Sequence, residues 1–175
     1  MKRWLGSMQR LWGMFKALLL VRGCTQKGWR VCLFGRIAIY NRGRLHLGTA
    51  VTFLEGLVPV QLRCEKEGVL HIGSRTMFAY GVQISSRNRV EIGSHCMFAP
   101  FVSISDFHNE GVGVSKPIII EDNVWVAHGA VIRPGVRIGE GSVVAAGSVV
   151  ETDIPKESLA IGNPARAIHL DMVAR

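Results

Sequence analysis

Hydrophobic residues recur at every sixth position through the second half of the chain. The series runs without a miss through Ile120, Val126, Ile132, Ile138, Val144 and Val150. An earlier series has the same spacing with one two-residue slip, and it contains Ile72, Phe78, Ile84, Ile92, Phe98 and Ile104. A period of six is neither the 3.6 of an amphipathic helix nor the 2 of an alternating strand. The pattern instead predicts a solenoid.

Each six-residue unit is interpreted as one short strand followed by a tight turn. If the repeated aliphatic side chain points inward, it stacks on its equivalent in the next coil and buries a continuous core from local contacts. Three units then close a triangular coil of about eighteen residues. Glycines at the corners, such as Gly129 and Gly147, supply backbone angles that other residues adopt only at a cost of ~1 kcal/mol or more. We therefore predict an all-β domain, a parallel β-helix, over residues 23–168, with a short tail at 169–175.

The N-terminal segment has a different period. Its large apolar residues fall within an arc of about 140° on a helical wheel, and they are Trp4, Leu5, Met8, Leu11, Trp12, Phe15, Leu18 and Leu19. This pattern predicts an amphipathic helix within residues 1–22. Because tryptophans and flanking cations suit a membrane interface, the helix could contact a membrane surface. Alternatively, the apolar stripe packs on the solenoid and caps its open end.

Composition and charge narrow the class of protein. The chain has 175 residues, of which 48% are hydrophobic and 19% charged, as expected for one globular domain. The formal charge of +8 favours an anionic partner, such as nucleic acid, an acidic membrane surface or a phosphorylated small molecule. The apolar run Ala17 to Val21 is far shorter than the ~20 residues that span a bilayer, so we expect neither a transmembrane anchor nor export.

The four cysteines form no CxxC pair and have no clustered histidine that would complete a zinc site. They are Cys24, Cys32, Cys64 and Cys96. We interpret them as reduced, structural thiols, which favours a cytoplasmic location.

One interruption of the repeat predicts a functional loop. Sixteen residues separate Ile104 from Ile120, so ten more than one unit are inserted, and the polar, glycine-containing stretch runs from Ser105 to Pro117. Excursions from a rigid solenoid project outward, and functional residues concentrate on such loops. His108 lies near the start of the loop, where an imidazole with a near-neutral pKa could act as a general base. A solvated loop histidine is the alternative.

Several stretches of the chain resemble the hexapeptide-repeat acyltransferases. They read IGSRTM, IGSHCM, EDNVWVAHGAVIRPGVRIGEGSVVAAGSVVETDIP and IGNPARAI, and the similarity covers roughly residues 45–168. The resemblance implies that the β-helix is left-handed, that the protein is a homotrimer with sites between subunits, and that acetyl-CoA is the co-substrate. Similarity to sugar O-acetyltransferases further implies a saccharide hydroxyl as acceptor, in bacterial surface polysaccharide biosynthesis. If the N-terminal helix binds a membrane, the acceptor could be a lipid-linked saccharide.

The resemblance also assigns catalytic roles. Sugar O-acetyltransferases of this family often carry, in the equivalent loop, Asp followed after one or two residues by the catalytic His, and Asp106 and His108 match that arrangement. His108 would take the proton from the acceptor hydroxyl in a ternary complex, while backbone N–H groups stabilise the oxyanion, without a covalent acyl-enzyme. Asp106 could orient the imidazole, bind the acceptor sugar or simply cap the loop.

For coenzyme A, the resemblance indicates a groove between subunits, with the phosphates near a basic residue. The matching positions are Trp125, His128, Ala146, Gly147, Ser148 and Arg166. His128 would contribute its N–H, and it is also a second candidate base. Two departures weaken the match: Thr152 stands where relatives often have Lys, and Gly81 stands where galactoside and maltose acetyltransferases place Asn.

Other functions stay open at this point. The same scaffold could acetylate the amine of a nucleotide-activated amino sugar or the hydroxyl of serine. A zinc-dependent hydratase would need His95, His108 and His128 to converge, although we expect no metal. A non-catalytic scaffold is a further alternative, and nucleic-acid binding is not expected, because only the charge supports it.

Overall fold

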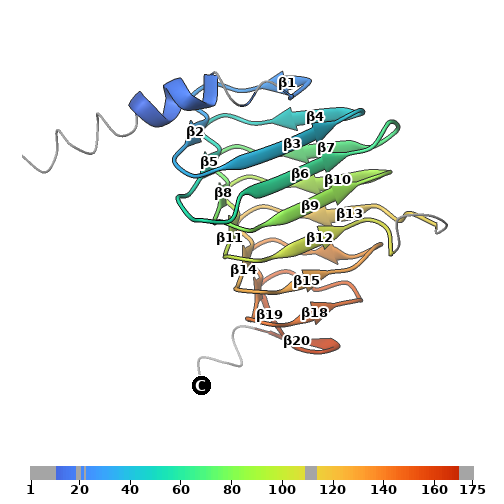
Figure 1. Ribbon diagram of the computed structural model, residues 1–175. Coiled ribbons are helices and arrows are strands. Elements are labelled where there is room, and N and C mark those ends of the chain that lie inside the picture. Colours follow the sequence, from blue (N-terminus) through green and yellow to red (C-terminus); the bar gives the residue numbers. More distant parts are fainter. Residues whose placement is uncertain (1–10, 19–20, 22, 109–113, 170–175) are drawn as a thin grey trace, which may run out of the picture.

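The computed structural model describes residues 11–18, 21, 23–108 and 114–169. These residues form a solenoid of three sheets, here called A, B and C, with a short helix at the N-terminal end (Figure 1). Sheet A contains β1 (Gln26–Lys27), β4 (Arg44–Leu47), β7 (Val69–Ile72), β10 (Arg89–Ile92), β13 (Ile118–Ile120) and β16 (Arg137–Ile138). Neighbouring strands in this sheet are parallel and come from successive coils.

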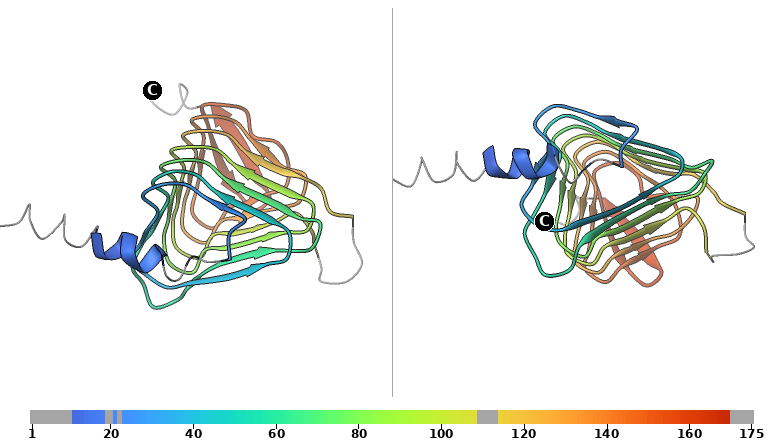
Figure 2. Two further views of the ribbon diagram at one scale, coloured as in Figure 1. Left: turned by 90° about the horizontal axis from the view of Figure 1, so that it is seen from above. Right: turned by 45° about the horizontal axis from the view of Figure 1, so that its top comes forward.

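Sheets B and C complete the triangle (Figure 2). Sheet B contains β2 (Cys32–Leu33), β5 (Thr52–Phe53), β8 (Met77–Phe78), β11 (Met97–Phe98), β14 (Trp125–Val126), β17 (Val143–Val144), β19 (Ser158–Gly162) and β20 (Ala165–His169). Sheet C contains β3 (Ile37–Asn41), β6 (Val60–Cys64), β9 (Gln83–Ser86), β12 (Ser103–Ser105), β15 (Val131–Ile132) and β18 (Val149–Val150). The β19–β20 hairpin, which closes the C-terminal end, is antiparallel.

The coil is left-handed. As the chain descends in Figure 1, the strands of sheet C run to the right at the front and those of sheet A return to the left behind them. Each coil takes one strand from each sheet, so the three corners, here called AB, BC and CA, repeat along the axis. The predicted left-handed parallel β-helix is confirmed.

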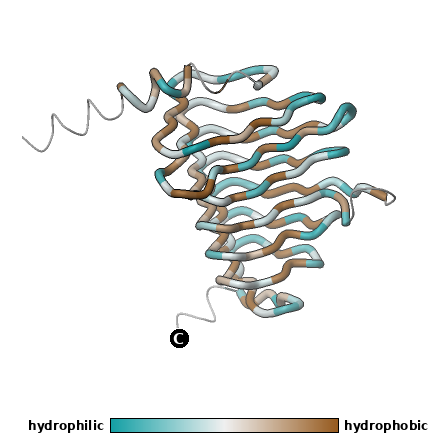
Figure 3. Tube along the Cα trace, in the orientation of Figure 1, coloured by the Kyte–Doolittle hydropathy of each residue, from teal (hydrophilic) through white to brown (hydrophobic). Residues whose placement is uncertain are grey.

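The six-residue period corresponds to the core. Successive members of each series point inward from different sheets, so that Ile72, Phe78 and Ile84 form one layer and Ile92, Phe98 and Ile104 the next. In sheet B the rings of Phe53, Phe78 and Phe98 stack with centroids 5.5 and 5.0 Å apart. Each fully buried aliphatic or aromatic side chain contributes about 1.5–3 kcal/mol. Figure 3 shows hydrophobic positions recurring from coil to coil.

The corners do not depend on glycine alone. Positive φ angles occur at Gly129 (65°) and Gly147 (68°), as expected, but also at Ala50, His95 and Phe101, with φ of 58°, 60° and 61°. The expectation that glycines supply these angles is therefore only partly right. Packing between neighbouring coils holds the other residues in this region despite its cost of about 1 kcal/mol or more.

Residues 11–18 form a helix against the N-terminal end of the solenoid. Its buried residues are the small ones, Gly13 and Ala17. A Cβ at position 13 would lie 3.1 Å from Cε1 of Phe34, so glycine permits the close approach. The expected helix within 1–22 is described only in this part, because residues 1–10, 19–20 and 22 lie outside the described residues, as does the tail at 170–175. In the described part, no helix is long and apolar enough to cross a bilayer.

Candidate functional site

The inserted loop leaves the solenoid at the CA corner, between β12 and β13, and Asp106 fixes its base. The Asp106 carboxylate is fully buried and accepts hydrogen bonds from the Ser86 hydroxyl (3.2 Å) and from the backbone N–H groups of Arg87 (2.9 Å), Asn88 (2.8 Å) and Arg89 (2.8 Å). The Asp106 carbonyl accepts from Lys116 N–H at 2.9 Å, which pinches the loop closed at its base. Asp106 thus ties the loop to the turn of the preceding coil.

Two residues farther along, His108 is exposed. Between them the buried Phe107 packs under Arg87, whose guanidinium carbon lies 4.2 Å from the ring centroid. Among the described residues, every hydrogen bond that the Asp106 carboxylate accepts comes from the turn, and none comes from His108. The arrangement positions the start of the loop through Asp106 and Phe107 and leaves the imidazole accessible.

A cavity of about 430 Å³ adjoins this part of the loop. Its lining comes from the end of β6, the β6–β7 turn, the β9–β10 turn and the loop, and consists of Arg63, Glu65, Lys66, Glu67, Arg87 and Phe107. Mixed charges beside an aromatic ring suit a polar ligand that can both donate and accept hydrogen bonds.

The predicted coenzyme positions gather instead along the BC corner. His128 and Ala146 occupy equivalent places in successive coils, and Gly147 N–H donates to the His128 carbonyl at 2.8 Å. Within the described part of the chain, the N–H groups of His128 and Ala146 have no hydrogen-bond partner. A Cβ added at Gly129 or Gly147 would meet no atom within 4 Å, so the space beside these N–H groups is open.

This geometry suits a thioester-bearing pantetheine arm. The two unpartnered N–H groups lie one coil apart, a spacing of about 4.8 Å. Donors fixed in the backbone can stabilise developing negative charge on a carbonyl oxygen without reorganising. The residues present therefore fit acetyl-CoA along this corner.

The remaining coenzyme positions differ in their roles. Ser148 is buried, and its hydroxyl accepts a hydrogen bond from Gly162 N–H at 3.1 Å, which attaches the β19–β20 hairpin to the corner. Arg166 is exposed on β20 beside this hairpin turn. Trp125 is 49% exposed on the outer face of sheet B, between Met97 and Val143 of the neighbouring strands. The Ser148 side chain is thus part of the scaffold, whereas Trp125 and Arg166 are accessible.

The two groups of predicted residues are not brought together within one chain. His108 and Asp106 follow β12 at the CA corner, whereas His128, Ala146 and Gly147 lie at the BC corner, at the other end of the sheet C strands. A site that uses both groups therefore needs a second chain.

The histidines required for a zinc site are similarly separated. His95 lies at the AB corner, His108 at the CA corner and His128 at the BC corner. No group of three or more His, Cys, Asp or Glu residues that could hold a metal occurs in the described parts of the chain. The four cysteines are free thiols, and burial raises the pKa of Cys24 and of Cys96 to about 11. At neutral pH these two thiols are protonated and poorly nucleophilic.

Sequence reasoning did not identify two aromatic contributions. Phe101 is 45% exposed at the BC corner and lies edge-on between Tyr80 and His128, with centroid distances of 5.4 and 5.6 Å. A Cβ at Gly81 would lie 2.7 Å from Phe101 Cδ1, so this ring fills the space that a side chain at position 81 would take. Phe101 could have been noticed in the sequence, because it stands at a repeat position that glycine occupies in other coils. No sequence pattern marks Phe107, which packs under Arg87.

Comparisons with known proteins agree with this architecture. Residues 117–152 match the family model described as bacterial transferase hexapeptide (six repeats). The chain is 37% identical over 107 residues to the galactoside O-acetyltransferase of Escherichia coli, covering 57% of this chain and 53% of that protein. The chain spans about half the length of the curated relatives it matches.

Two solved structures extend the likeness to most of the chain. A hexapeptide-repeat-containing acetyltransferase of Vibrio cholerae, solved with acetyl-CoA, is 25% identical, with a TM-score of 0.59 and coverage of 89% of this chain and 75% of that chain. An N-acyltransferase of Bacillus cereus, solved with coenzyme A and an amino-sugar nucleotide, is 20% identical, with a TM-score of 0.70 and 88% coverage of both chains, and shows the fold alone. Residues 117–152 therefore match the hexapeptide repeats of bacterial transferases, and the chain is similar in sequence to a galactoside O-acetyltransferase over about half the length of that protein.

Proposed function

We propose that the protein transfers an acetyl group from acetyl-CoA to a hydroxyl of a saccharide. The observation that carries this proposal is the open BC corner, where the N–H groups of His128 and Ala146 lack partners beside Gly129 and Gly147. The sequence similarity to a galactoside O-acetyltransferase supports a sugar hydroxyl as the acceptor.

In this mechanism acetyl-CoA supplies the acetyl group as a thioester. His108 accepts the proton of the acceptor hydroxyl as the oxygen attacks, and later returns it to the leaving thiolate. The His128 N–H donates a hydrogen bond to the carbonyl oxygen where negative charge develops. Asp106 acts as a positioning residue, because its carboxylate holds the base of the loop against the β9–β10 turn.

Each complete site combines two copies of the chain, within a homotrimer. The loop of one subunit and the BC corner of its neighbour supply the base and the coenzyme groove. The exposed apolar side chains of Met97 and Trp125 on sheet B suit burial against a second copy. Arg166 lies near the coenzyme phosphates, where a guanidinium makes charge-assisted hydrogen bonds.

We further propose a role in bacterial surface polysaccharide synthesis at the cytoplasmic side of a membrane, with an acceptor that is free or lipid-linked. The positive charge of the chain suits a negatively charged or phosphorylated acceptor.

Thiol release from acetyl-CoA tests the reaction and the base. The wild type should release thiol only with an acceptor, and His108→Ala should lower kcat by ~100-fold or more, as expected for loss of a general base. His71→Ala is the matched control, because His71 is also exposed but lies on sheet A. Equal rates for wild type and His108→Ala would exclude His108 and favour His128. A panel of neutral sugars, acidic sugars and amino sugars distinguishes O-acetylation from N-acetylation.

Subunit sharing has a separate test. Trimers made only of His108→Ala chains or only of Gly147→Val chains are expected to be inactive. In trimers that mix the two chains at random, about a quarter of the sites should be active, because such a site takes its loop from a Gly147→Val chain and its groove from a His108→Ala chain. Hybrids without any regained activity would contradict a shared site.

A further inference from the structure

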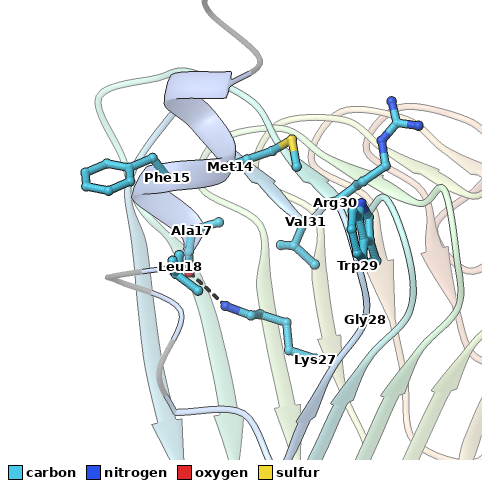
Figure 4. Close-up of a pocket in the computed structure, with 9 residues that line it drawn as sticks. All are labelled: Met14, Phe15, Ala17, Leu18, Lys27, Gly28, Trp29, Arg30 and Val31. Atoms are coloured by element: carbon cyan, nitrogen blue, oxygen red, sulfur yellow. Dashed lines mark hydrogen bonds between the residues drawn. The ribbon is translucent and has the colours of Figure 1, made fainter.

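The helix at residues 11–18 turns its large apolar side chains away from the solenoid. Leu11, Trp12, Phe15 and Leu18 are 66%, 60%, 51% and 63% exposed, whereas the inward residues are Gly13 and Ala17. On a helical wheel the four exposed residues cover an arc of about 120°. Trp29, on the turn before β2, is 74% exposed nearby and shares a cavity with Phe15 and Leu18 (Figure 4). We call these five residues the N-terminal apolar face.

This orientation is the reverse of what a capping helix needs. A helix that served only to cover the open end would bury its large residues and expose its small ones. Here close approach through Gly13 and Ala17 attaches the helix, and Lys27 Nζ donates to the Ala17 carbonyl at 3.1 Å (Figure 4). Of the two alternatives for the apolar stripe, packing on the solenoid leaves its four described large residues more than half exposed. Contiguous exposed apolar residues of this kind mark interaction surfaces.

The positive charge of the chain is concentrated in the N-terminal third of the sequence. Residues 1–54 contain ten Lys and Arg residues and no Asp or Glu, whereas residues 55–175 contain eleven Lys and Arg and thirteen Asp and Glu. Of the described cations, Lys16 lies on the helix itself, 5.9 Å from the Trp12 ring, and Lys27 and Arg30 flank Trp29. Glu55 is the one acidic residue that lines the cavity beside Trp12 and Lys16, in the described part of the chain.

We propose that the N-terminal apolar face docks the protein on a bilayer that contains anionic lipids. Leucine, phenylalanine and tryptophan side chains enter the boundary between headgroups and acyl chains, while the surrounding lysines and arginines contact the phosphates. Two tryptophans suit this depth, because the indole has an apolar body and a polar N–H. Charge complementarity favours an anionic bilayer over a second copy of this chain, because two copies would bring like charges together.

The helix lies beside the N-terminal coils of the solenoid, far from the β19–β20 hairpin at the other end (Figure 1). Burial and charge support this docking independently of the proposed acetyl transfer.

Co-sedimentation of the full chain with vesicles tests the proposal. Vesicles of phosphatidylcholine are compared with vesicles that also contain phosphatidylglycerol, at low and high salt. The combined variant Trp12→Glu, Phe15→Glu removes two anchors, and Leu11→Ala with Leu18→Ala is a milder second variant. Val114→Glu is the matched control, because Val114 is 80% exposed in the inserted loop between β12 and β13, outside the N-terminal apolar face. Circular dichroism and unfolding midpoints establish that all variants are folded.

The wild type and Val114→Glu should sediment with the anionic vesicles, and less at high salt. The double glutamate variant should bind at least ~10-fold more weakly, because each inserted apolar side chain adds to the affinity. Wild-type protein that stays in the supernatant with both vesicles would overturn the proposal. So would equal binding by the glutamate variant, or a fall in its oligomeric state without lipid, which would assign the face to a second copy.

Discussion

Replacing Asp106 by alanine should destabilise the protein more than any other change in the loop. Its carboxylate is fully buried and is the acceptor for three backbone N–H groups, those of Arg87, Asn88 and Arg89, and for one hydroxyl, that of Ser86. A donor left without a partner costs about 1–3 kcal/mol when buried. These N–H groups are only partly buried, so water can reach some of them, and we take the lower end of that range. The expected loss is ~3 kcal/mol, a large share of the 5–15 kcal/mol typical of a domain.

Asp106→Asn separates the hydrogen bonds from the shape of the side chain. The amide retains one acceptor oxygen but turns an NH2 group toward backbone donors, so we expect a loss of ~1–2 kcal/mol, between wild type and Asp106→Ala. Urea unfolding at one fixed protein concentration measures all three proteins, with His108→Ala as the control. Because His108 is exposed, its replacement should change the free energy of unfolding by less than ~0.5 kcal/mol.

Activity measured on the same proteins then decides what Asp106 does. If Asp106 positions the loop, loss of kcat should parallel loss of stability, with Asp106→Asn again intermediate. Unchanged stability in Asp106→Ala would refute the structural reasoning. A large loss of kcat with wild-type stability in Asp106→Asn would instead assign Asp106 a direct part in catalysis.

Three further predictions concern the corners and the core. Gly147→Ala should raise the KM for acetyl-CoA, because the new Cβ enters the open groove. Gly141→Ala is the control: its φ at the AB corner is similar (69° against 68°), so each variant should lose ~1 kcal/mol of stability, but Gly141→Ala should leave the KM unchanged. An equal rise of the KM in both variants would contradict the groove. Arg87→Ala removes the guanidinium 4.2 Å from the Phe107 ring and should lower kcat a few-fold, with partial recovery in Arg87→Lys, since this contact is worth about 0.5–1 kcal/mol at an exposed site; full activity in Arg87→Ala would show that the contact does not hold the loop. Burial raises the pKa of the Cys96 thiol from 9.0 to about 11, so between these pH values the unfolded chain loses this proton first and the free energy of unfolding falls as pH rises. Cys96→Ala should flatten the pH dependence of the free energy of unfolding between pH 8 and 11. If the pH dependence is the same in Cys96→Ala, Cys96 is not its source.

The fold could be predicted from the sequence because its contacts are local in the repeat. A side chain in one coil packs on its equivalent in the next. The spacing of Ile72, Ile92 and Ile120 therefore predicts that these residues stack in sheet A, as they do. The handedness could not be derived from the period, because a period of six fits either hand, and it came only from the resemblance to known proteins. The non-glycine corners at His95 and Phe101 were also unpredictable, because coil packing overrides local preference there.

The candidate site was only partly accessible to sequence reasoning. The interruption between Ile104 and Ile120 located the loop, and motif similarity made His108 and Gly147 candidates for the site. Spacing left three roles open for Asp106. Its buried carboxylate accepts hydrogen bonds from backbone N–H groups of the β9–β10 turn, so Asp106 anchors the base of the loop. Ser148 could be matched to a coenzyme motif, but its hydroxyl faces Gly162, which lies too far along the chain for a local pattern to reveal.

The sequence by itself determined the repeat, the core positions, the place of the loop and the amphipathic character of the N-terminal helix, because each of these depends on residue type and spacing alone. Only the tertiary structure decided that the three candidate histidines of a zinc site lie at three different corners. It also decided that Trp12 and Phe15 face solvent while Gly13 and Ala17 face the solenoid. Both facts depend on which surfaces of distant segments approach one another. A periodic pattern predicts that a helix has an apolar and a polar face. Which face is buried depends on the shape of the partner surface, and here the ring of Phe34 packs against Gly13.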